Sequence, residues 1–352
     1  MRSIFDTIVI GSGQAGLATA YYLQKNNLNY LVLEASEQTA GSWPSYYDSL
    51  TLFSPARYSS LPGYQFPGDP ERYPTKREVI SYLVEYANHF DLNISTGERV
   101  TEVQKNQGVF QISTSKQNIF YAKTVVSATG DFARKCIPDI DGIDVFKRLK
   151  IHSSEYKNVE QYIDQRIVVV GGGNSAVQIA YELAKISNVT IATRRPLSFT
   201  PQRLLGKDIH FWLRITGFDY LPLEKWFSIN TSVLDEGIYK QAVLNNEPER
   251  KPMFMSFTED GVIWEDGKEE KIDTVIFATG YRPNVVFLQS LNGALDALGS
   301  PLQRKGISQT INGLYYVGLS EQRSFSSATL RGVGPDAKYV VKKIKSLKLD
   351  ME

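Results

Sequence analysis

The chain of 352 residues is poor in cysteine and in histidine, with one cysteine and three histidines. The single cysteine, Cys136, leaves no second thiol for an internal disulfide or for a CxxC redox pair. His210 has no neighbouring pattern of histidine, cysteine and carboxylate that is typical of a metal site, so we expect no metal. The scarcity of thiols excludes a reductase that works through a dithiol.

The sequence also has almost no net charge and no long apolar run. Its 39 Lys and Arg and its 38 Asp and Glu give a net charge of +1, so nothing indicates nucleic acid or an acidic membrane surface as a partner. No apolar run approaches the roughly 20 residues of a membrane span, and the N-terminus has no signal-peptide pattern. We therefore expect a cytoplasmic protein. Its length suits two domains, each with a core of its own.

Near the N-terminus, a strand, a glycine-rich turn and a helix follow one another. The buried-strand run at 7–10 meets Gly11, Gly13 and Gly16 in GxGxxG spacing, and a helical stretch at 17–24 follows. The first glycine permits the tight turn, the second lets a pyrophosphate approach the backbone, and the third lets helix and strand pack closely. The helix N-terminus offers free N–H groups and a positive dipole end to phosphates. This unit predicts a dinucleotide site.

The strand that follows this helix, at 30–33, ends in the acid Glu34. A carboxylate at this place accepts hydrogen bonds from ribose hydroxyls and repels a 2′-phosphate. The first unit therefore favours the adenosine half of FAD.

The same arrangement recurs in the middle of the chain. A strand at 167–170 leads into a GxGxxA turn and a helix of about three turns, and a second strand follows at 189–192. The residues expected to bind the second cofactor here are Gly171, Gly173, Asn174, Ser175 and Ala176.

In the second unit an arginine replaces the acid. Glu34 lies 23 residues beyond Gly11, and Arg194 lies 23 residues beyond Gly171, with Arg195 beside it. A guanidinium pairs with a phosphate through two parallel N–H bonds and keeps its charge. Because a 2′-phosphate separates NADPH from NADH, we predict FAD at the first site and NADPH at the second, with NADH still possible. The alternative is that Arg194 and Arg195 are only solvent-exposed charges at the end of a strand.

Two apolar strands end in the same Ala-Thr-Gly sequence, one after each glycine-rich turn. They lie at 123–130 and 273–283. Small residues at the end of a buried parallel strand let the chain leave the sheet beside a bound nucleotide. The contacts expected from these strand ends are Thr129, Gly130, Thr279 and Gly280.

The C-terminal part returns to the first domain. A short strand at 314–317 stops at Gly318, and a terminal helix is expected after Gly332 and Gly334, with Pro335 near its first turn. The N-terminus of that helix would face the flavin ring or the pyrophosphate, although an ordinary glycine-marked helix start explains the pattern equally well.

The predicted fold is α/β, with two Rossmann-like dinucleotide-binding domains and the NADPH domain inserted into the FAD domain. The FAD domain is expected at 1–160 and 281–352, and the NADPH domain at 161–280, with a helical and β insert at about 198–270. Core packing is the first interpretation of the aromatic residues of the insert, and a substrate entrance or a dimer face is the second. These aromatic residues include Phe211, Trp212, Trp226 and Phe227.

Together these motifs resemble those of the small bacterial flavin-containing monooxygenases, which belong to the class B flavoprotein monooxygenases. The fingerprint of that family, FxGxxxHxxxY/F, precedes the second glycine-rich turn. It matches Phe146, His152 and Tyr156, and it departs at Arg148, where the family has glycine. The resemblance covers essentially the whole chain.

Two further family motifs are present. The FATGY sequence is intact at 277–281, and the GxW element resembles residues 41–43. The resemblance places Gly41 and Trp43 among the FAD-binding residues.

The resemblance also suggests three catalytic candidates, Phe53, His152 and Tyr156. The fingerprint forms the linker between the two domains of the family, so His152 is expected to orient rather than to transfer protons. Baeyer–Villiger relatives usually carry tryptophan where Tyr156 stands, which favours oxygenation of nitrogen or sulfur. Phe53 stands where many members carry an asparagine that steadies the oxygenated flavin, and phenylalanine makes no such hydrogen bond.

The activity that this resemblance implies is an FAD-dependent, NADPH-consuming monooxygenase. It would use dioxygen to oxygenate a sulfide or an amine through a C4a-hydroperoxyflavin. The alternative is an NADPH-dependent flavoprotein reductase that passes electrons to a quinone, a metal ion or a protein carrier, and a non-enzymatic redox sensor is a third reading. The expected partners are a small-molecule substrate and dioxygen, and a homodimer is possible.

Overall fold

The computed structural model describes residues 3–132, 134–221 and 232–349. A nine-stranded sheet forms its first half and joins strands from the N-terminal and C-terminal parts of the chain, with the order β21-β22-β23-β6-β1-β2-β3 and with β4 and β5 attached beside β6. Its central pairs, β1 with β2 and β1 with β6, are parallel. The strands are β1 (Ile4–Ile10), β2 (Tyr30–Leu33), β3 (Ile94–Ser95), β4 (Val100–Asn106), β5 (Val109–Thr114), β6 (Ile119–Ser127), β21 (Gln303–Arg304), β22 (Ile307–Ser308) and β23 (Leu314–Tyr316).

A second sheet has five parallel strands in the order β15-β10-β9-β19-β8. Its middle strands are almost wholly buried, as the continuous apolar runs of the sequence predict for a parallel sheet covered on both faces. The strands are β8 (Leu149–His152), β9 (Arg166–Val170), β10 (Asn188–Thr193), β15 (Glu249–Pro252) and β19 (Thr274–Phe277).

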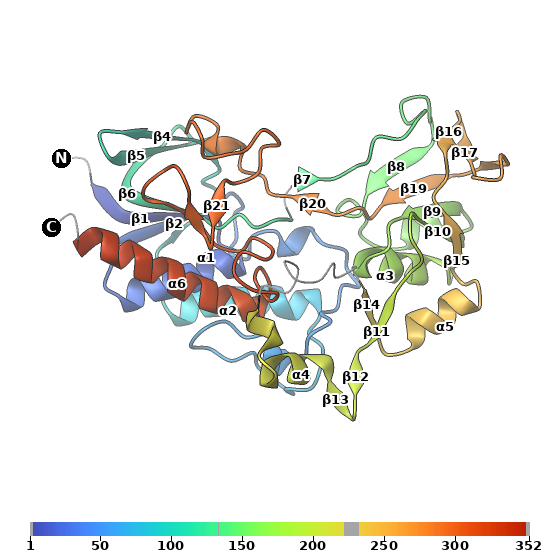
Figure 1. The fold of residues 1–352 in the computed structure, drawn as a ribbon, viewed down its shortest axis with the longest axis horizontal. Coiled ribbons are helices and arrows are strands. Elements are labelled where there is room, and N and C mark those ends of the chain that lie inside the picture. Colours follow the sequence, from blue (N-terminus) through green and yellow to red (C-terminus); the bar gives the residue numbers. More distant parts are fainter. Residues whose placement is uncertain (1–2, 133, 222–231, 350–352) are drawn as a thin grey trace.

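The second sheet is inserted into the first. The chain leaves the first sheet after β6 and returns to it at β21, and every strand of the second sheet lies between them in sequence. The two crossings pair as short antiparallel strands, β7 (Arg134–Lys135) and β20 (Tyr281–Arg282), which lie between the two halves in Figure 1. The predicted fold class, with one dinucleotide-binding domain inserted into the other, is thereby confirmed.

The main helices lie against these sheets. On the first half, α1 (Gln14–Lys25) packs against α2 (Lys76–His89) and α6 (Leu330–Leu349), and on the second half α3 (Asn174–Leu183) packs against α5 (Ile238–Leu244). The apolar faces of α1, α2 and α6 share one core with the first sheet. Short 3-10 turns complete the helices and are η1 (Trp43–Ser45), η2 (Ala56–Tyr58), η3 (Glu160–Tyr162) and η6 (Val286–Leu288).

The predicted insert at about 198–270 consists of three parts with different positions. Residues 199–221, which we call the insert arm, contain β11 (Phe199–Pro201), β12 (Arg203–Leu204), β13 (Lys207–Asp208), α4 (Ile209–Ile215) and η4 (Phe218–Tyr220). After β14 (Val233–Asp235) and α5, the strand β15 joins the second sheet and is therefore part of that domain. A three-stranded antiparallel unit follows, with β16 (Ser256–Phe257), β17 (Gly261–Ile263) and β18 (Glu269–Lys271).

Some predictions remain outside what the structure tests. Trp226 and Phe227 lie outside the described residues. The boundary at 160/161 stays a prediction, and β8, which lies before it in sequence, pairs with β19 in the second sheet. Among the described residues, no helix is long and apolar enough to cross a membrane, and no group of three or more His, Cys, Asp or Glu is placed to hold a metal ion.

Candidate functional site

A cavity of about 700 Å³ runs along the first glycine-rich turn and reaches the start of α3. This volume lies within the range of about 300–1,000 Å³ that is usual for small-molecule and cofactor sites. The residues predicted from sequence that line it are Gly11, Gly13, Glu34, Gly41, Trp43, Phe53, Thr129, Gly130, Asn174, Ser175 and Gly318. The predicted residues outside its wall are Gly16, His152, Tyr156, Gly171, Gly173, Ala176, Arg194, Arg195, Thr279, Gly280, Gly332 and Gly334.

The glycines of the first turn make a narrow, uncapped helix start beside this cavity. Gly11 has a φ of +102°, and a Cβ on Gly16 would lie 1.8 Å from the Gly11 carbonyl oxygen, so the turn and the helix need both glycines. A Cβ on Gly13 would meet, within the described part of the chain, nothing nearer than the Cα of Gly41 at 3.9 Å. No side chain caps the N-terminus of α1. The free N–H groups of α1 are thus left for an anion such as a pyrophosphate.

Glu34 lies at the cavity wall with both carboxylate oxygens held. Its side chain accepts hydrogen bonds from the backbone N–H and the hydroxyl of Ser12, at 2.7 and 2.8 Å, and from the same two groups of Ser36, at 2.9 and 2.6 Å. These four bonds fill the acceptor positions of an ionised carboxylate. Glu34 thus ties the first glycine-rich turn to the segment that follows β2.

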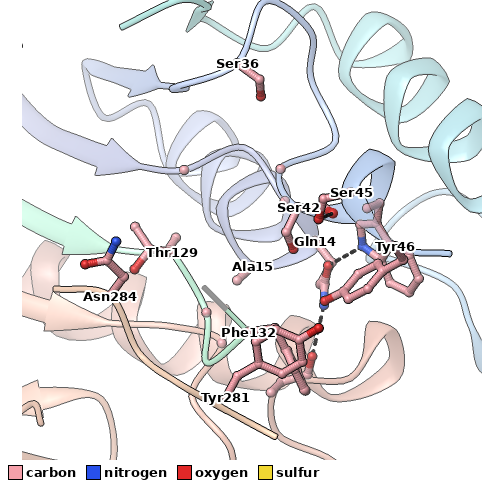
Figure 2. Close-up of a pocket in the computed structure, with 18 of the residues that line it drawn as sticks. Gln14, Ala15, Ser36, Ser42, Ser45, Tyr46, Thr129, Phe132, Tyr281 and Asn284 are labelled. Carbon is pink, nitrogen blue, oxygen red and sulfur yellow. Dashed lines mark hydrogen bonds between the residues drawn. The ribbon is translucent and has the colours of Figure 1, made fainter. Parts of the chain in front are cut away.

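Gln14 joins two loops of the cavity wall, and the sequence analysis missed it. The indole N–H of Trp43 donates to its side-chain oxygen at 2.7 Å, and its amide donates to the carbonyl of Ala328 at 3.0 Å (Figure 2). Burial raises the pKa of Tyr46, which packs edge-on against Trp43, to about 12. Tyr46 therefore stays neutral at physiological pH. A glutamine inside a glycine-rich motif has no sequence signal of its own that would have identified this bridge.

The second unit reaches the cavity through the first turn of α3. Asn174, Ser175 and Gln178 line it, and the hydroxyl of Tyr47 donates to the side-chain oxygen of Gln178 at 2.5 Å. No side chain caps α3, and a Cβ on Gly173 would meet nothing within 4 Å among the described residues. The helix start of the second unit is thus as open as that of the first.

His152, at the end of β8, is fully buried and ties this strand to the FATGY segment. Its Nδ1 accepts from the backbone N–H of Ser154 at 3.2 Å, so the proton lies on Nε2, which donates to the Gly280 carbonyl at 3.0 Å. Its ring packs edge-on against Tyr281, which lines the cavity. This geometry supports the predicted orienting role, because neither ring nitrogen faces the cavity as a free acid or base.

Burial lowers the pKa of His152 below its usual value of about 6.5. As the pH falls through 6.5, the unfolded chain binds a proton that the folded chain does not, so the free energy of unfolding should fall with it. We expect the urea midpoint to drop between pH 7.5 and 5.5, and to drop less in His152→Gln, whose amide keeps the bond to Gly280. Equal pH dependence in the two proteins would contradict this assignment.

Tyr156 lies in the core beside the second sheet and away from the cavity. It is fully buried, its hydroxyl donates to Glu182 at 3.0 Å, and its ring packs against Tyr162 and Tyr47. Burial raises its pKa above the ordinary range, so it remains a neutral phenol. A direct catalytic contact is therefore not supported, and its position is that of a packing residue.

Phe53 faces the cavity, with 38% of its surface exposed. Its ring stacks on that of His210, with 6.2 Å between ring centres, and its carbonyl accepts from the amide of Gln202 at 2.8 Å. The residue predicted to face the flavin therefore lies on the wall of the cavity, with the insert arm behind it.

Arg194 and Arg195 are exposed and follow directly after β10. Arg250 of β15 was not predicted, and it donates through Nε to the hydroxyl of Thr193 at 3.0 Å. Arg194, Arg195 and the guanidinium of Arg250 therefore all lie at or next to the end of β10 along the chain or across the sheet. The pairing of β15 with β10, which brings Arg250 there, has no local signal in the sequence.

The terminal helix begins earlier than predicted. Gly332 and Gly334 lie inside the first turns of α6, which starts at Leu330, and not before it. A Cβ on Gly332 would lie 1.8 Å from the Ser326 carbonyl oxygen, and one on Gly334 would lie 3.0 Å from Pro62. Gly332 is therefore required for close packing of the helix start, and Gly334 lies close to Pro62. Ala328 to Arg331 line the cavity.

Two Rossmann-like units, one inserted into the other, contribute to the wall of one cavity. Residues 8–214 match the pyridine nucleotide-disulphide oxidoreductase family, and the chain belongs to that family as a flavin-containing monooxygenase. It is thus a flavin-dependent enzyme of a class that uses a flavin and a nicotinamide cofactor. The resemblance found in the sequence is confirmed.

Similar proteins cover nearly the whole chain. It is 34% identical over 348 residues to the CzcO-like oxidoreductase of Geobacillus kaustophilus (strain HTA426), across 98% of this chain and 99% of that protein. Indole-3-pyruvate monooxygenase YUCCA1 of Oryza sativa subsp. japonica is 29% identical over 380 residues, across 96% and 90%. The structure of the flavin-containing monooxygenase from Stenotrophomonas maltophilia superimposes with a TM-score of 0.87 at 27% identity, across 99% of each chain.

Proposed function

We propose that the enzyme binds FAD in its first unit and NADPH in its second, and that it oxygenates a soft nucleophile, a sulfide or an amine. The observation that carries the proposal is one cavity whose wall joins the glycine turn of the first unit, the start of α3 and a set of aromatic side chains. The aromatic residues of this wall include Trp43, Tyr46, Phe53, Phe132 and Tyr281.

The first unit fits FAD. The uncapped start of α1 suits the pyrophosphate, and Glu34 stands where the adenosine ribose is bound in such units. The chemistry that bound FAD would supply is acceptance of a hydride from a nicotinamide and activation of dioxygen. The chain contributes binding, orientation and the exclusion of water.

The second unit fits NADPH in the same way. The open start of α3 suits its pyrophosphate, and Arg194 and Arg195 stand where a 2′-phosphate is recognised. Asn174 and Ser175, in the first turn of α3, line the cavity and would hold the cofactor where the two units meet.

The wall residues suit a substrate that reacts through a lone pair. The neutral phenol of Tyr46 and the ring of Phe53 offer no general base. The two carboxylates that line the cavity, Glu34 and Glu98, already accept hydrogen bonds from other protein groups. Sulfides and tertiary amines present their lone pair without losing a proton. The chain's one cysteine also leaves dithiol chemistry without a second thiol, although the family name includes disulphide reduction.

Phe53 provides a test of how the wall controls the chemistry. Phe53→Asn should raise the ratio of oxygenated product to hydrogen peroxide about two- to tenfold, because a hydrogen bond near the flavin is worth roughly 0.5–1.5 kcal/mol. Phe53→Leu, which removes the ring and adds no hydrogen bond, is the matched control. A ratio that is the same in all three proteins would place Phe53 away from the reacting atoms.

A further inference from the structure

Two buried carboxylates of the insert arm hold residues of the cavity wall. Asp208 and Asp219 are the only acids in residues 199–221, and they are 3% and 4% exposed. A buried carboxylate is costly unless hydrogen bonds or an opposite charge compensate it. Both are fully engaged, and in each case the contacts lead to the first domain.

Asp208 is the centre of a polar network that reaches Phe53. It accepts from Nδ1 of His210 at 2.7 Å, from the hydroxyl of Tyr73 at 2.6 Å and from the amide of Gln202 at 2.8 Å. Burial acts to raise the pKa of Asp208, but the hydrogen bonds from His210, Tyr73 and Gln202 hold it below its ordinary value. Tyr73 belongs to the first domain, so the network joins the insert arm to that domain.

Two members of this network contact Phe53 directly. Gln202 gives one amide N–H to Asp208 and the other to the Phe53 carbonyl at 2.8 Å. The His210 ring is nearly parallel to that of Phe53, at 22°, and it stacks likewise on Tyr58 at 25°. Asp208 thus fixes the backbone of Phe53 through Gln202 and its ring through His210.

Asp219 holds Arg331, which lies at the start of α6. Both of its carboxylate oxygens accept from Nε of Arg331, at 3.1 and 2.9 Å, and Arg331 lines the cavity. The Ser326 hydroxyl donates to the Asp219 carbonyl at 2.8 Å, and the Phe325 N–H donates to Leu221 at 2.9 Å. In Figure 1 the insert arm, with α4, lies near the start of α6, as these hydrogen bonds require.

We infer that the insert arm sets the shape of the substrate cavity, with Asp208 as the positioning residue for Phe53 and Asp219 as the positioning residue for Arg331. The consequence for substrate selection rests on the proposed function, whereas the positioning itself does not. Neither aspartate lines the cavity, so each acts through the wall residue that it holds.

Hydrogen–deuterium exchange of the flavin-loaded protein tests the positioning. Asp208→Asn should speed exchange at 50–54 and leave 325–331 unchanged, and Asp219→Asn should do the reverse, each about 10- to 100-fold, as expected for the loss of hydrogen bonds to a charged group. Arg214→Gln removes a charge from the exposed side of the same arm and is the control. If Asp208→Asn fails to fold, Tyr73→Phe removes one bond to Asp208 and should speed exchange at 50–54 more weakly.

Steady-state kinetics of the same variants measure the effect of the lost positioning on substrate selection. The KM of a sulfide or amine should rise about tenfold in each aspartate variant, with the KM of NADPH and the flavin content unchanged. The inference is overturned if both aspartate variants exchange at 50–54 and 325–331 at the same rate as the Arg214→Gln control. It is also overturned if exchange is faster but the substrate KM does not change. A parent protein that oxygenates no sulfide or amine would overturn the proposed function, and the exchange pattern would still decide the positioning.

Discussion

Gly13→Ala should give a folded protein that is purified without its yellow flavin. The added Cβ would meet no described atom nearer than the Gly41 Cα at 3.9 Å, so the fold tolerates it. It would project instead towards the cavity, where the pyrophosphate of FAD must approach the backbone. Crowding of this kind costs about 1–3 kcal/mol, which raises the dissociation constant of FAD about 5- to 150-fold.

Gly16→Ala is the matched comparison, three residues away in the same motif. Its Cβ would lie 1.8 Å from the Gly11 carbonyl oxygen, so this variant should lose stability and not only flavin. Isothermal titration of apoprotein with FAD and a thermal melt separate the two effects. A folded Gly13→Ala protein that keeps stoichiometric FAD would contradict the assignment of the first unit.

The double variant Arg194→Ala/Arg195→Ala should lose its preference for NADPH. A guanidinium paired with a phosphate is worth roughly 1.5–3 kcal/mol, so the KM for NADPH should rise about ten- to a hundredfold. NADH lacks the phosphate, and its KM should stay nearly constant. The single Arg194→Ala variant should show part of the loss if Arg195 shares the contact.

Steady-state kinetics with both nucleotides decide this point, and Arg250→Ala is a useful third variant. Arg250 bonds Thr193 at the end of β10 through Nε, so its loss tests whether it adds to the phosphate site. Equal changes for NADPH and NADH, or no change for either in the double variant, would refute the claim that these arginines recognise the phosphate.

Much of the fold could be predicted from the sequence because each unit repeats a local pattern. The strand at 30–33 agrees with β2, and the strand at 167–170 agrees with β9 to within one residue. Apolar runs bounded by glycine turns predict buried parallel strands, because both the runs and the turns can be recognised from neighbouring residues alone. The insertion followed from the order of the two repeated units.

The parts that sequence could not supply depend on contacts between distant segments. β15 (Glu249–Pro252) consists of three charged residues and a proline, and only its pairing with β10 makes it part of the second sheet. Gly332 was predicted to precede the start of the terminal helix. A glycine is needed there because the Ser326 carbonyl packs against it and leaves no room for a Cβ. In both cases the local pattern was ambiguous and tertiary packing decided the outcome.

The residues of the candidate site also fall into those that the sequence predicted and those that it did not. Gly11, Gly13 and Glu34 carry their chemistry in local spacing, and they line the cavity as expected. Gly171 and Gly173 of the second turn were predicted from the same kind of spacing, but they lie outside the cavity wall. Gln14, Arg331 and the pair Asp208 and Asp219 carry no motif, because their roles come from partners that lie far away in sequence. His152 was recognised only by the fingerprint around it.

The most direct test of the central claim is a reaction of the flavin-loaded protein with NADPH, a methyl aryl sulfide or a tertiary amine, and ¹⁸O₂, followed by mass spectrometry of the product. A monooxygenase places one oxygen atom from dioxygen in each product molecule, so the sulfoxide or N-oxide should be heavier by one ¹⁸O, and NADPH oxidation should rise when the substrate is added. Hydrogen peroxide as the sole product across a broad panel of such substrates, with no labelled oxygen in any of them, would contradict the account and leave a reductase in its place.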